Sequence, residues 1–317
     1  MAPPATPAPA HSRKGNRITA LRWARLLREL GHGVTVELEY RRSRPDVMVA
    51  LHARRSHTSI KRYRERFPDR PLILALTGTD LYTDIHTDTD AQESLELADL
   101  YVVLQPAGIS ELPERLRHKA RVIYQSVVPP RSEPEPLGDV FEIAVIGHMR
   151  PVKDPFRTAE ASRLLPPDSR IAVTHVGGAL SPDMEERAIQ EAADNPRYRW
   201  HGELPRGQAM RILARSRCLV LTSVSEGGAN VISEALACGT PVISSHITGS
   251  TGLLGDDYAG YFPVGDTQAL AARLTQVETD PSYMVRLTAQ CASQREIVDP
   301  TRERADWARL LREVTGC

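Results

Sequence analysis

The sequence predicts an α/β protein of two domains, each built on a parallel sheet. Three observations lead to this prediction. The chain has 317 residues, about twice the length of a common domain. Short apolar patterns typical of strands alternate with helical patterns, and the strand pattern at 71–76 is apolar at every position, as in a sheet covered on both faces. Two such series are separated by a proline-rich segment without apolar periodicity, residues 129–138.

The first series starts with a helix rather than a strand. Residues 17–30 have apolar side chains at helical spacing, and Gly31 and Gly33 follow as terminators. Residues 1–14 are rich in proline and alanine, lack the apolar stretch of a signal peptide, and are expected to be disordered. The expected strands are 34–38, 46–51, 71–76, 100–104 and 121–125, and the other helices are 55–67 and 90–98.

The second series repeats the alternation. Its expected strands are 141–147, 170–178, 218–223 and 240–244, and its helices are 154–164, 228–238, 266–277, 281–294 and 301–315. Such units give parallel sheets with right-handed crossovers, so we expect two Rossmann-like domains facing a cleft, with ligands at the carboxyl ends of the strands. The expected boundaries are an N-terminal domain at 1–130, a linker at 131–138, a C-terminal domain at 139–300, and a last helix at 301–317 that crosses back to the first domain.

The net charge, the lack of long apolar runs and the cysteine content argue against several classes of protein. Lys plus Arg and Asp plus Glu both number 40, so the net charge is zero, which argues against a nucleic-acid binder. No run of 18 apolar residues is present, so no membrane span is expected. Cys218, Cys238, Cys291 and Cys317 lie far apart without a C-x-x-C pair, which argues against a metal site and fits a reducing cytoplasm.

The most specific local pattern is EGGANVISE at 226–234, which follows a strand pattern and opens a helix. Gly227 and Gly228 let a ligand approach the backbone, and the free N–H groups of the helix start can hold a diphosphate. Glu226 is expected in the turn, and Glu234, about two turns further on, could accept hydrogen bonds from a ribose diol. A plain strand–turn–helix with solvated glutamates fits the same letters.

Lys153 is the second candidate. It follows the first strand of the second domain, after the segment 147–152, and a lysine at a strand end is a point charge for phosphate. An exposed surface lysine is the alternative. The segments 237–244 and 249–252 add loops at strand ends, although each glycine in them also fits an ordinary turn.

In this order and spacing, the segments resemble the C-terminal half of GT-B glycosyltransferases with an E-x7-E motif, through G-x5-K at 147–153, E-x7-E at 226–234 and A-x-G-x-P-V at 237–242. The resemblance implies that Lys153 contacts the diphosphate of a nucleotide sugar and Glu226 the donor sugar. Where the family usually has an arginine, this chain has His148, which could still donate to the second phosphate, especially if protonated. The other implied donor-binding residues are Gly227, Gly228, Ala229, Asn230, Glu234, Gly202, Leu204, Ser250 and Thr251.

The first half extends the resemblance. GNRITALRWAR at 15–25, LTGTDLY at 76–82 and VLQP at 103–106, with GHMRPVKDP at 147–155, resemble the selenosugar synthases, the glycosyltransferases of selenoneine biosynthesis. The likeness runs over most of residues 15–315. It implies transfer of a sugar from UDP-GlcNAc, or a related UDP-sugar, to selenophosphate, with formation of a carbon–selenium bond and release of UDP and phosphate.

A selenophosphate acceptor needs cations more than a strong general base, because selenium is already nucleophilic. Arg13, Lys14 and Arg17 surround Gly15, and Arg54 and Arg55 follow His52 at a strand end, although a solvated basic surface is the alternative. Asp80 could orient an acceptor or cap a turn. The implied acceptor-binding residues are Gly15, Asn16, Arg17, His52, Arg54, Thr77, Thr79, Asp80 and Gln105.

No cofactor or metal is expected. Asp88 and Asp90 have the letters of a D-x-D metal motif, but they precede a helix, where aspartate serves as a cap. The expected partners are UDP-sugar and selenophosphate, with no nucleic acid and no membrane; other selenoneine-pathway enzymes and the oligomeric state stay open. The alternatives are an ordinary glycosyltransferase with a hydroxyl acceptor and a non-catalytic UDP-sugar-binding module.

Overall fold

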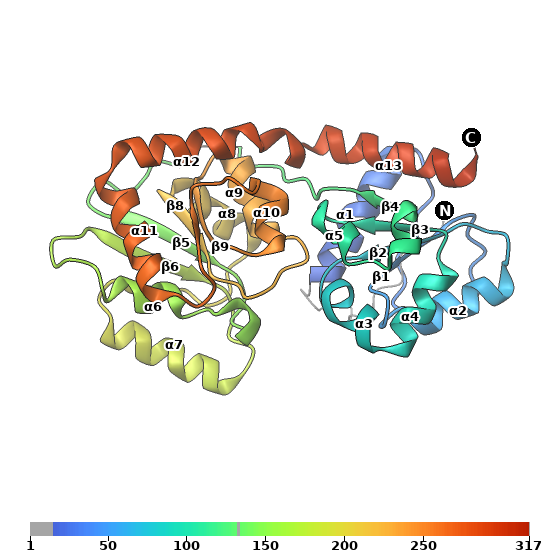
Figure 1. Ribbon diagram of the computed structural model, residues 1–317, viewed down its shortest axis with the longest axis horizontal. Coiled ribbons are helices and arrows are strands. Elements are labelled where there is room, and N and C mark those ends of the chain that lie inside the picture. The colour runs from blue at the N-terminus through green and yellow to red at the C-terminus, as the bar shows by residue number, and fades with distance from the viewer. Residues whose placement is uncertain (1–14, 132–133, 317) are drawn as a thin grey trace. The chain divides into compact units, whose positions relative to one another are not determined.

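The computed structural model describes residues 15–131 and 134–316 (Figure 1). The expectations for residues 1–14, including Arg13 and Lys14, lie outside the described residues. The chain divides into two compact units. Unit 1 contains the chain up to Gln125 together with the segment that starts at Pro300, and unit 2 contains Ser126–Asp299.

Unit 1 is built on a sheet of four parallel strands in the order β1-β2-β3-β4. Its side chains alternate between two apolar clusters, so that Met48 and Ala50 face one cluster and Val49 and Leu51 the other. Both faces are therefore covered, as the fully apolar strand patterns predicted. The strands are β1 (Met48–Leu51), β2 (Leu72–Leu76), β3 (Leu100–Val103) and β4 (Ala120–Val122).

Helices cover both faces of this sheet. They are α1 (Gly15–Glu29), α2 (His57–Arg66), α3 (Ile85–Thr87), α4 (Thr89–Leu97), α5 (Ala107–Ser110) and α13 (Pro300–Thr315), with a π-helical turn at Asp80–Asp84 and a 3-10 turn at Glu114–Lys119.

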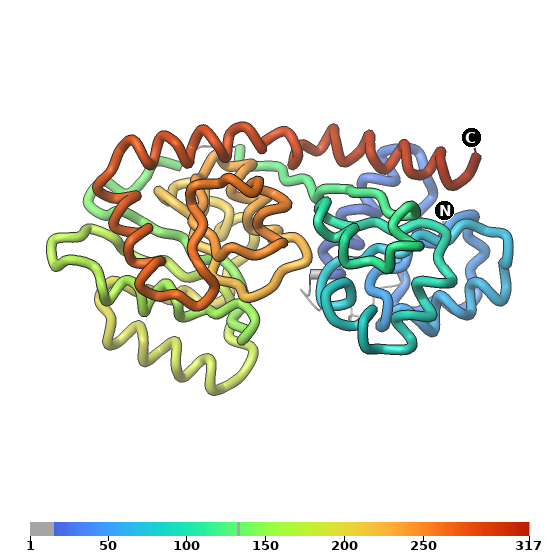
Figure 2. Tube along the Cα trace, viewed as in Figure 1, coloured from blue at the N-terminus to red at the C-terminus, as the bar shows by residue number. Residues whose placement is uncertain are grey.

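The last helix of the chain packs in unit 1, beside the first helix (Figure 2). The rings of Trp23 and Trp307 meet edge to face with centroids 4.8 Å apart. The Trp23 indole N–H donates to the buried Glu303 carboxylate at 2.7 Å. This apolar and polar contact fixes α1, whose first turn carries the predicted acceptor residues.

The strand expected at 34–38 does not form. Val34 and Val36 pack against the cluster under α1 and α13, but Leu38 is half-exposed. The alternation of the sequence therefore describes a connecting segment whose two valines pack against this cluster, and not a strand. Apolar alternation over five residues is too short to separate these two outcomes.

Unit 2 is built on six parallel strands in the order β10-β9-β8-β5-β6-β7. The chain moves outward from β5 through β6 to β7 and then returns to the other side of β5 for β8. The strand order thus reverses between β5 and β8, the place where such sheets bind ligands. The strands are β5 (Phe141–Ile146), β6 (Ile171–Val176), β7 (Tyr198–Trp200), β8 (Cys218–Leu221), β9 (Val242–Ser245) and β10 (Tyr261–Phe262).

Seven helices accompany these strands in the described part of unit 2. The sequence analysis did not predict α7, α8 or α10. The start of α7 nevertheless has local signals, because Ser181 caps it, Pro182 starts it and acidic residues fill its first turn. The helices are α6 (Arg157–Ser162), α7 (Pro182–Asp194), α8 (Arg206–Arg215), α9 (Asn230–Cys238), α10 (Thr248–Leu254), α11 (Thr267–Thr279) and α12 (Pro281–Ser293). Among the described residues, no helix combines the length and the apolar character that crossing a membrane requires.

Candidate functional site

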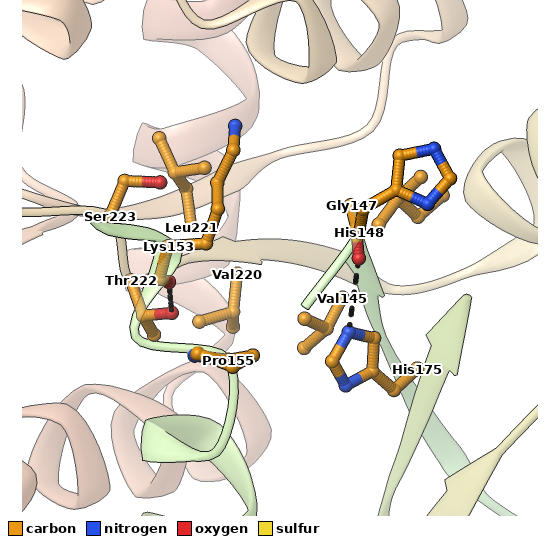
Figure 3. Close-up of a pocket in the computed structure, with 11 residues that line it drawn as sticks. Val145, Gly147, His148, Lys153, Pro155, His175, Val220, Leu221, Thr222 and Ser223 are labelled. Atoms are coloured by element: carbon orange, nitrogen blue, oxygen red, sulfur yellow. Dashed lines mark hydrogen bonds between the residues drawn. The ribbon is translucent and has the colours of Figure 1, made fainter. Parts of the chain in front are cut away.

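A pocket lies in unit 2 at the carboxyl ends of β5 and β8. Its position is the strand-order reversal described above, so the topology of the sheet itself places it. Figure 3 shows Lys153 and His148 on opposite sides of this pocket, with His175 beyond the carbonyl of Gly147. The lining residues are Val145, Ile146, Gly147, His148, Lys153, Pro155, His175, Val220, Leu221, Thr222 and Ser223.

The loop that carries Lys153 is tied to the end of β8. Lys153 closes a short 3-10 turn, and Asp154 after it has a left-handed backbone with φ of 43°. The Thr222 hydroxyl is within hydrogen-bond distance of the carbonyls of Lys153 (2.9 Å) and Asp154 (2.8 Å). The Val224 N–H donates to the carbonyl of Val152 at 2.8 Å. The lysine side chain therefore starts from a backbone that two strand ends hold in place.

Lys153 forms an ion pair with Glu226 within unit 2. The Ser223 hydroxyl donates to the same carboxylate at 2.7 Å. Both side chains remain partly exposed, 28% for Lys153 and 13% for Glu226, so a ligand can reach them. Glu226 lies directly before the glycines that lead into α9, so the structure brings the lysine and the glutamate motif together.

The start of α9 offers backbone donors to this pair. The helix runs from Asn230 for nine residues, and Ala229 occupies the position before it. An alanine there has no side-chain oxygen to cap the first turn. The Ile232 N–H donates to the Ala229 carbonyl at 2.8 Å, so the N–H groups of Asn230 and Val231 are the donors that the helix start offers to an anion. This arrangement and the adjacent Lys153 are complementary to a diphosphate.

Glu234 faces outward from the middle of α9 and accepts a hydrogen bond from Arg206, at the start of α8, at 2.9 Å. Its side chain is 19% exposed. The Arg206 guanidinium therefore fixes the position of the Glu234 carboxylate. Arg206 was not among the predicted site residues, because an arginine in this arginine-rich chain has no local signal that distinguishes it.

The remaining predicted donor residues lie in the loop after β7 and in α10, and they are not among the residues that line the pocket. Gly202 has φ of 65°, and its carbonyl accepts the Gly177 N–H at 2.8 Å, so it fixes the loop after β6. Leu204 lies half-buried in the loop before α8. Ser250 is buried, its hydroxyl bonds to that of Ser244, and its N–H donates to the Ile247 carbonyl at 2.9 Å. The Thr251 N–H donates to the same carbonyl at 3.0 Å, so both residues support α10.

His175 is a buried residue behind the pocket that the sequence analysis did not select. Its Nε2–H donates to the Gly147 carbonyl at 3.3 Å, and its Nδ1 accepts the Tyr198 hydroxyl at 2.8 Å. Because the carbonyl can only accept, Nε2 must carry the proton. Burial lowers the pKa of His175 to about 4, so the ring is neutral and supports the pocket wall.

We expect this histidine to make the protein less stable in acid. The pKa of His175 falls from 6.5 in the unfolded chain to about 4 in the folded one, so the unfolded state binds more protons in between. Its contribution is complete above pH 6.5 and is lost as the pH falls toward 4, by about 3 kcal/mol in total at 1.36 kcal/mol per unit. Urea unfolding of wild type and His175→Gln between pH 7.5 and 4 checks this, since the difference in unfolding free energy should shrink on acidification. Parallel curves for wild type and His175→Gln would contradict the assignment.

In unit 1, predicted acceptor residues gather at the carboxyl ends of the strands. Asn16, in the first turn of α1, accepts a hydrogen bond from the Thr77 hydroxyl at 3.0 Å. His52 follows β1 with a left-handed φ of 78° and lies 3.5 Å from the Thr79 hydroxyl. Gln105, after β3, is buried and donates to the Tyr82 hydroxyl at 2.8 Å.

A carboxylate that sequence reasoning missed completes this group. Asp84 is buried, and one of its oxygens lies 3.4 Å from Arg54 and 3.7 Å from His52. Burial and the charges of Arg55 and Arg54 lower the pKa of His52 to about 4 against the opposing effect of Asp84, so His52 is neutral. Asp84 lies in the π-helical turn after Asp80, a local geometry that no apolar pattern signals.

Asp80 is fully buried, and its two oxygens accept the N–H groups of Gly78 (2.9 Å) and Ala53 (3.1 Å). It therefore links the loops that follow β1 and β2. Burial raises its pKa to about 6 against these hydrogen bonds. Gly15 is the first residue of α1 and Arg17, in the same turn, is half-buried.

The D-x-D segment is a helix cap. Asp88 accepts the N–H of Ala91 at 2.9 Å and starts α4, while Asp90 lies in the first turn of that helix. Across the described residues, no group of three or more histidines, cysteines, aspartates and glutamates is arranged to hold a metal ion.

Comparison with known families places these residues in context. A family model described as Glycosyl transferases group 1 matches residues 131–294. The match covers 164 of the 317 residues and includes the whole pocket, Glu226 and Glu234. The chain is also 25% identical over 226 residues to the O-antigen chain mannosyltransferase B of Escherichia coli. That match covers 66% of this chain and 59% of the relative, so the chain spans less than two thirds of that protein's length.

Solved structures share the architecture. Sucrose-phosphate synthase from Thermosynechococcus elongatus has a TM-score of 0.76 at 16% identity, over 96% of this chain and 94% of that one. Anabaena HepE, crystallised with UDP-glucose, has a TM-score of 0.69 at 17% identity, over 84% and 79%. At these identities the likeness concerns the fold alone. The prediction of a GT-B fold with two parallel-sheet α/β domains is confirmed.

Proposed function

The chain belongs to the glycosyl transferases group 1, and from this premise we propose that it transfers a sugar from a UDP-sugar to selenophosphate. The observation that carries the transferase part is the meeting of Lys153, Glu226 and the start of α9 at the strand-order reversal of unit 2. A relative of the same fold was crystallised with UDP-glucose, which supports a UDP-sugar as donor. The alternative of a non-catalytic binding module fits less well, because Glu226 is positioned beside the cation that a leaving diphosphate needs.

The chemistry follows from where charge develops. As the bond between the anomeric carbon and the diphosphate oxygen breaks, the electron pair stays on UDP. The ammonium of Lys153 and the backbone N–H groups before α9 stabilise this charge, in positions fixed before the reaction. Glu226, held by Ser223, contacts the hydroxyls of the donor sugar. Glu234 binds the ribose hydroxyls.

The acceptor supplies its own nucleophile. A selenium lone pair of selenophosphate attacks the anomeric carbon, the new bond is C–Se, and water cleaves the P–Se bond to release phosphate. No strong general base is required. The residues proposed to hold the acceptor are those of unit 1 at the ends of β1 to β3, where Arg54 and Arg17 provide positive charge and Asn16 and Thr77 provide hydrogen bonds.

An ordinary hydroxyl acceptor is the second candidate, and one observation favours it. Asp84 places a buried carboxylate oxygen beside the neutral His52, an arrangement that can accept a hydroxyl proton. The resemblance of the N-terminal segments to selenosugar synthases favours selenophosphate. The two candidates differ in the acceptor only, so one assay separates them.

That assay incubates the protein with UDP-GlcNAc, UDP-glucose or UDP-galactose and enzymatically prepared selenophosphate. We expect mass spectrometry to detect a sugar with the selenium isotope pattern, with one UDP released per selenosugar formed. Replacing selenophosphate by phosphate is the matched control and should give no product. UDP release that depends on a hydroxyl acceptor and not on selenophosphate would assign the second candidate.

Removing Glu234 is expected to weaken nucleotide binding more than catalysis. Glu234→Ala takes away an acceptor for the ribose hydroxyls, so UDP affinity should fall about tenfold or more, the scale of a hydrogen bond to a charged group. Calorimetry with UDP measures the change. Arg206→Ala, which leaves the carboxylate in place, should have a smaller effect; an unchanged affinity in Glu234→Ala would contradict the ribose role.

We propose that the reaction needs no metal. Lys153 and the backbone donors supply the positive charge that a metal would provide, so activity should persist in EDTA. The initial rate with and without chelator is the measurement. Loss of activity in EDTA and its return with magnesium would instead assign a metal role to the segment of Asp88 and Asp90.

A further inference from the structure

The side chain of His148 makes one hydrogen bond that constrains its chemistry. The ring nitrogen Nδ1 accepts the backbone N–H of Gly178 at 3.1 Å. A backbone amide can only donate, so Nδ1 needs a free lone pair. A neutral imidazole whose Nδ1 has no proton carries its proton on Nε2. The contact therefore requires the Nε2–H form of a neutral ring.

Hydrogen bonds and close packing fix the position of the backbone around this contact. The loops after β5 and β6 are joined by hydrogen bonds from Gly147 to Val176 (2.9 Å) and from Met149 to Gly178 (3.0 Å). They also approach so closely that a Cβ at Gly177 would lie 1.9 Å from the Gly147 carbonyl oxygen. The glycine at this position lets the two loops touch, and so holds the Gly178 amide against the ring of His148.

The ring also lines the pocket. His148 lies across it from Lys153 (Figure 3). Since Nδ1 is occupied by Gly178, Nε2–H is the donor that the ring has left. Among the described residues that line the pocket, Lys153 is the one lysine or arginine.

Building on the proposed function, we propose that His148 binds the diphosphate of the nucleotide sugar as an uncharged donor, through Nε2–H, with Gly178 selecting this form of the ring. An arginine at this position would always be charged, whereas this form of the histidine ring is not. In this chain Lys153 then provides the formal positive charge, while His148 provides a hydrogen bond of defined direction to the diphosphate.

The alternative to the neutral ring is a protonated one, and the charged groups around the ring determine which of the two is favoured. A Cβ at Gly178 would lie 3.4 Å from Nδ1 and 3.6 Å from a carboxylate oxygen of Glu203, so this acid is near the ring. An imidazolium paired with Glu203 would break the Gly178 contact. Glu203 is exposed, which screens its charge. Lys153, on the opposite side, opposes a positive ring, and buried His175 is neutral.

The form of the ring can be observed directly. In protein labelled with ¹⁵N-histidine, long-range ¹H–¹⁵N correlation spectra distinguish the two neutral forms and the imidazolium. The signal of His148 is identified by its loss in His148→Asn. We expect the Nε2–H pattern at pH 7.5, with Nδ1 unprotonated. An imidazolium or an Nδ1–H pattern at this pH overturns the proposal.

Two isosteric variants separate the structural role of the ring from its role toward the ligand. Asparagine can place an acceptor near the position of Nδ1 and so keep the Gly178 contact, whereas glutamine can place a donor near Nε2. We expect His148→Asn to keep the thermal unfolding midpoint and to weaken UDP binding about tenfold or more, the cost of a hydrogen bond to a charged group. His148→Gln should recover part of that affinity. Wild-type UDP affinity in His148→Asn overturns the proposal.

The dependence of UDP affinity on ionic strength tests whether the ring of His148 is uncharged. If the ring is neutral, UDP affinity should fall equally steeply with ionic strength in wild type and in His148→Asn. A steeper fall in wild type means that His148 binds as a cation and overturns the proposal. Failure of the wild-type protein to bind UDP at all contradicts the proposed function, whereas the spectrum of His148 still reports whether Gly178 sets the form of the ring.

Discussion

Lys153→Ala is expected to lower kcat/KM for the UDP-sugar by at least about 10²-fold, the scale of losing one preorganised charge contact in a transition state. The loss should be this large because Lys153 is the cation that lines the pocket, and Thr222 and Val224 fix the backbone that carries it. Steady-state rates over a range of UDP-sugar concentrations measure the effect. Rates near wild type would remove Lys153 from the site.

A matched control removes a lysine of the same charge elsewhere. Lys61 is exposed on α2 and pairs with Glu93, a surface pair of small energetic value. Lys61→Ala should therefore leave kcat/KM unchanged. A loss in both variants would point to net charge rather than to position.

The ion pair between Lys153 and Glu226 sharpens this prediction. A diphosphate that binds Lys153 competes with Glu226 for the same ammonium. Glu226→Gln should therefore lower turnover, because the donor sugar loses its carboxylate partner, while UDP itself should bind more tightly than to wild type. Opposite signs for catalysis and product affinity distinguish this arrangement from general damage to the pocket, which would weaken both.

Gly249→Ala is expected to lower kcat/KM by roughly 10²-fold, because small displacements of catalytic groups have effects of that size. A Cβ at this position would lie 2.3 Å from the carbonyl oxygen of Glu226 and 2.7 Å from its Cβ. Either α10 or the backbone of Glu226 must move to make room. The glycine is a positioning residue, since it acts on Glu226 through the shape of the backbone.

Gly207→Ala is the matched control for this change. It lies in α8, where an added Cβ meets no atom of the described chain within 4 Å. Alanine there should leave the rate unchanged and slightly favour the helix. Circular dichroism should show that both variants fold. A folded Gly249→Ala with wild-type kcat/KM would show that the position of Glu226 does not depend on this contact.

Much of the fold could be predicted because its signals are local. The strand at 71–76 is apolar at every position, as in a parallel sheet covered on both faces. The helix that starts near Gly228 follows a strand and a glycine turn. The segment at 34–38 shows the limit of such signals, because its valines pack against the sheet without pairing with it.

The sequence could predict several residues of the site, but it could not predict which side chains contact one another there. Lys153 and Glu226 have signals in glycine spacing and in the helix that follows. Asp84 and Arg206 have none, because each acquires its role from a neighbour distant in the chain. The same holds for Gly178, whose amide sets the form of the His148 ring.

The sequence by itself determined the alternation of strands and helices, the glycine-rich turns and the identity of the charged residues after them, since each depends on neighbours a few positions away. Only the tertiary structure decided that β8 pairs with β5 rather than with the strand before it. That pairing brings together Lys153 and Glu226, which are 73 positions apart. The physical reason is that sheet order depends on how whole helices cover the sheet, and no short segment of the chain contains that information.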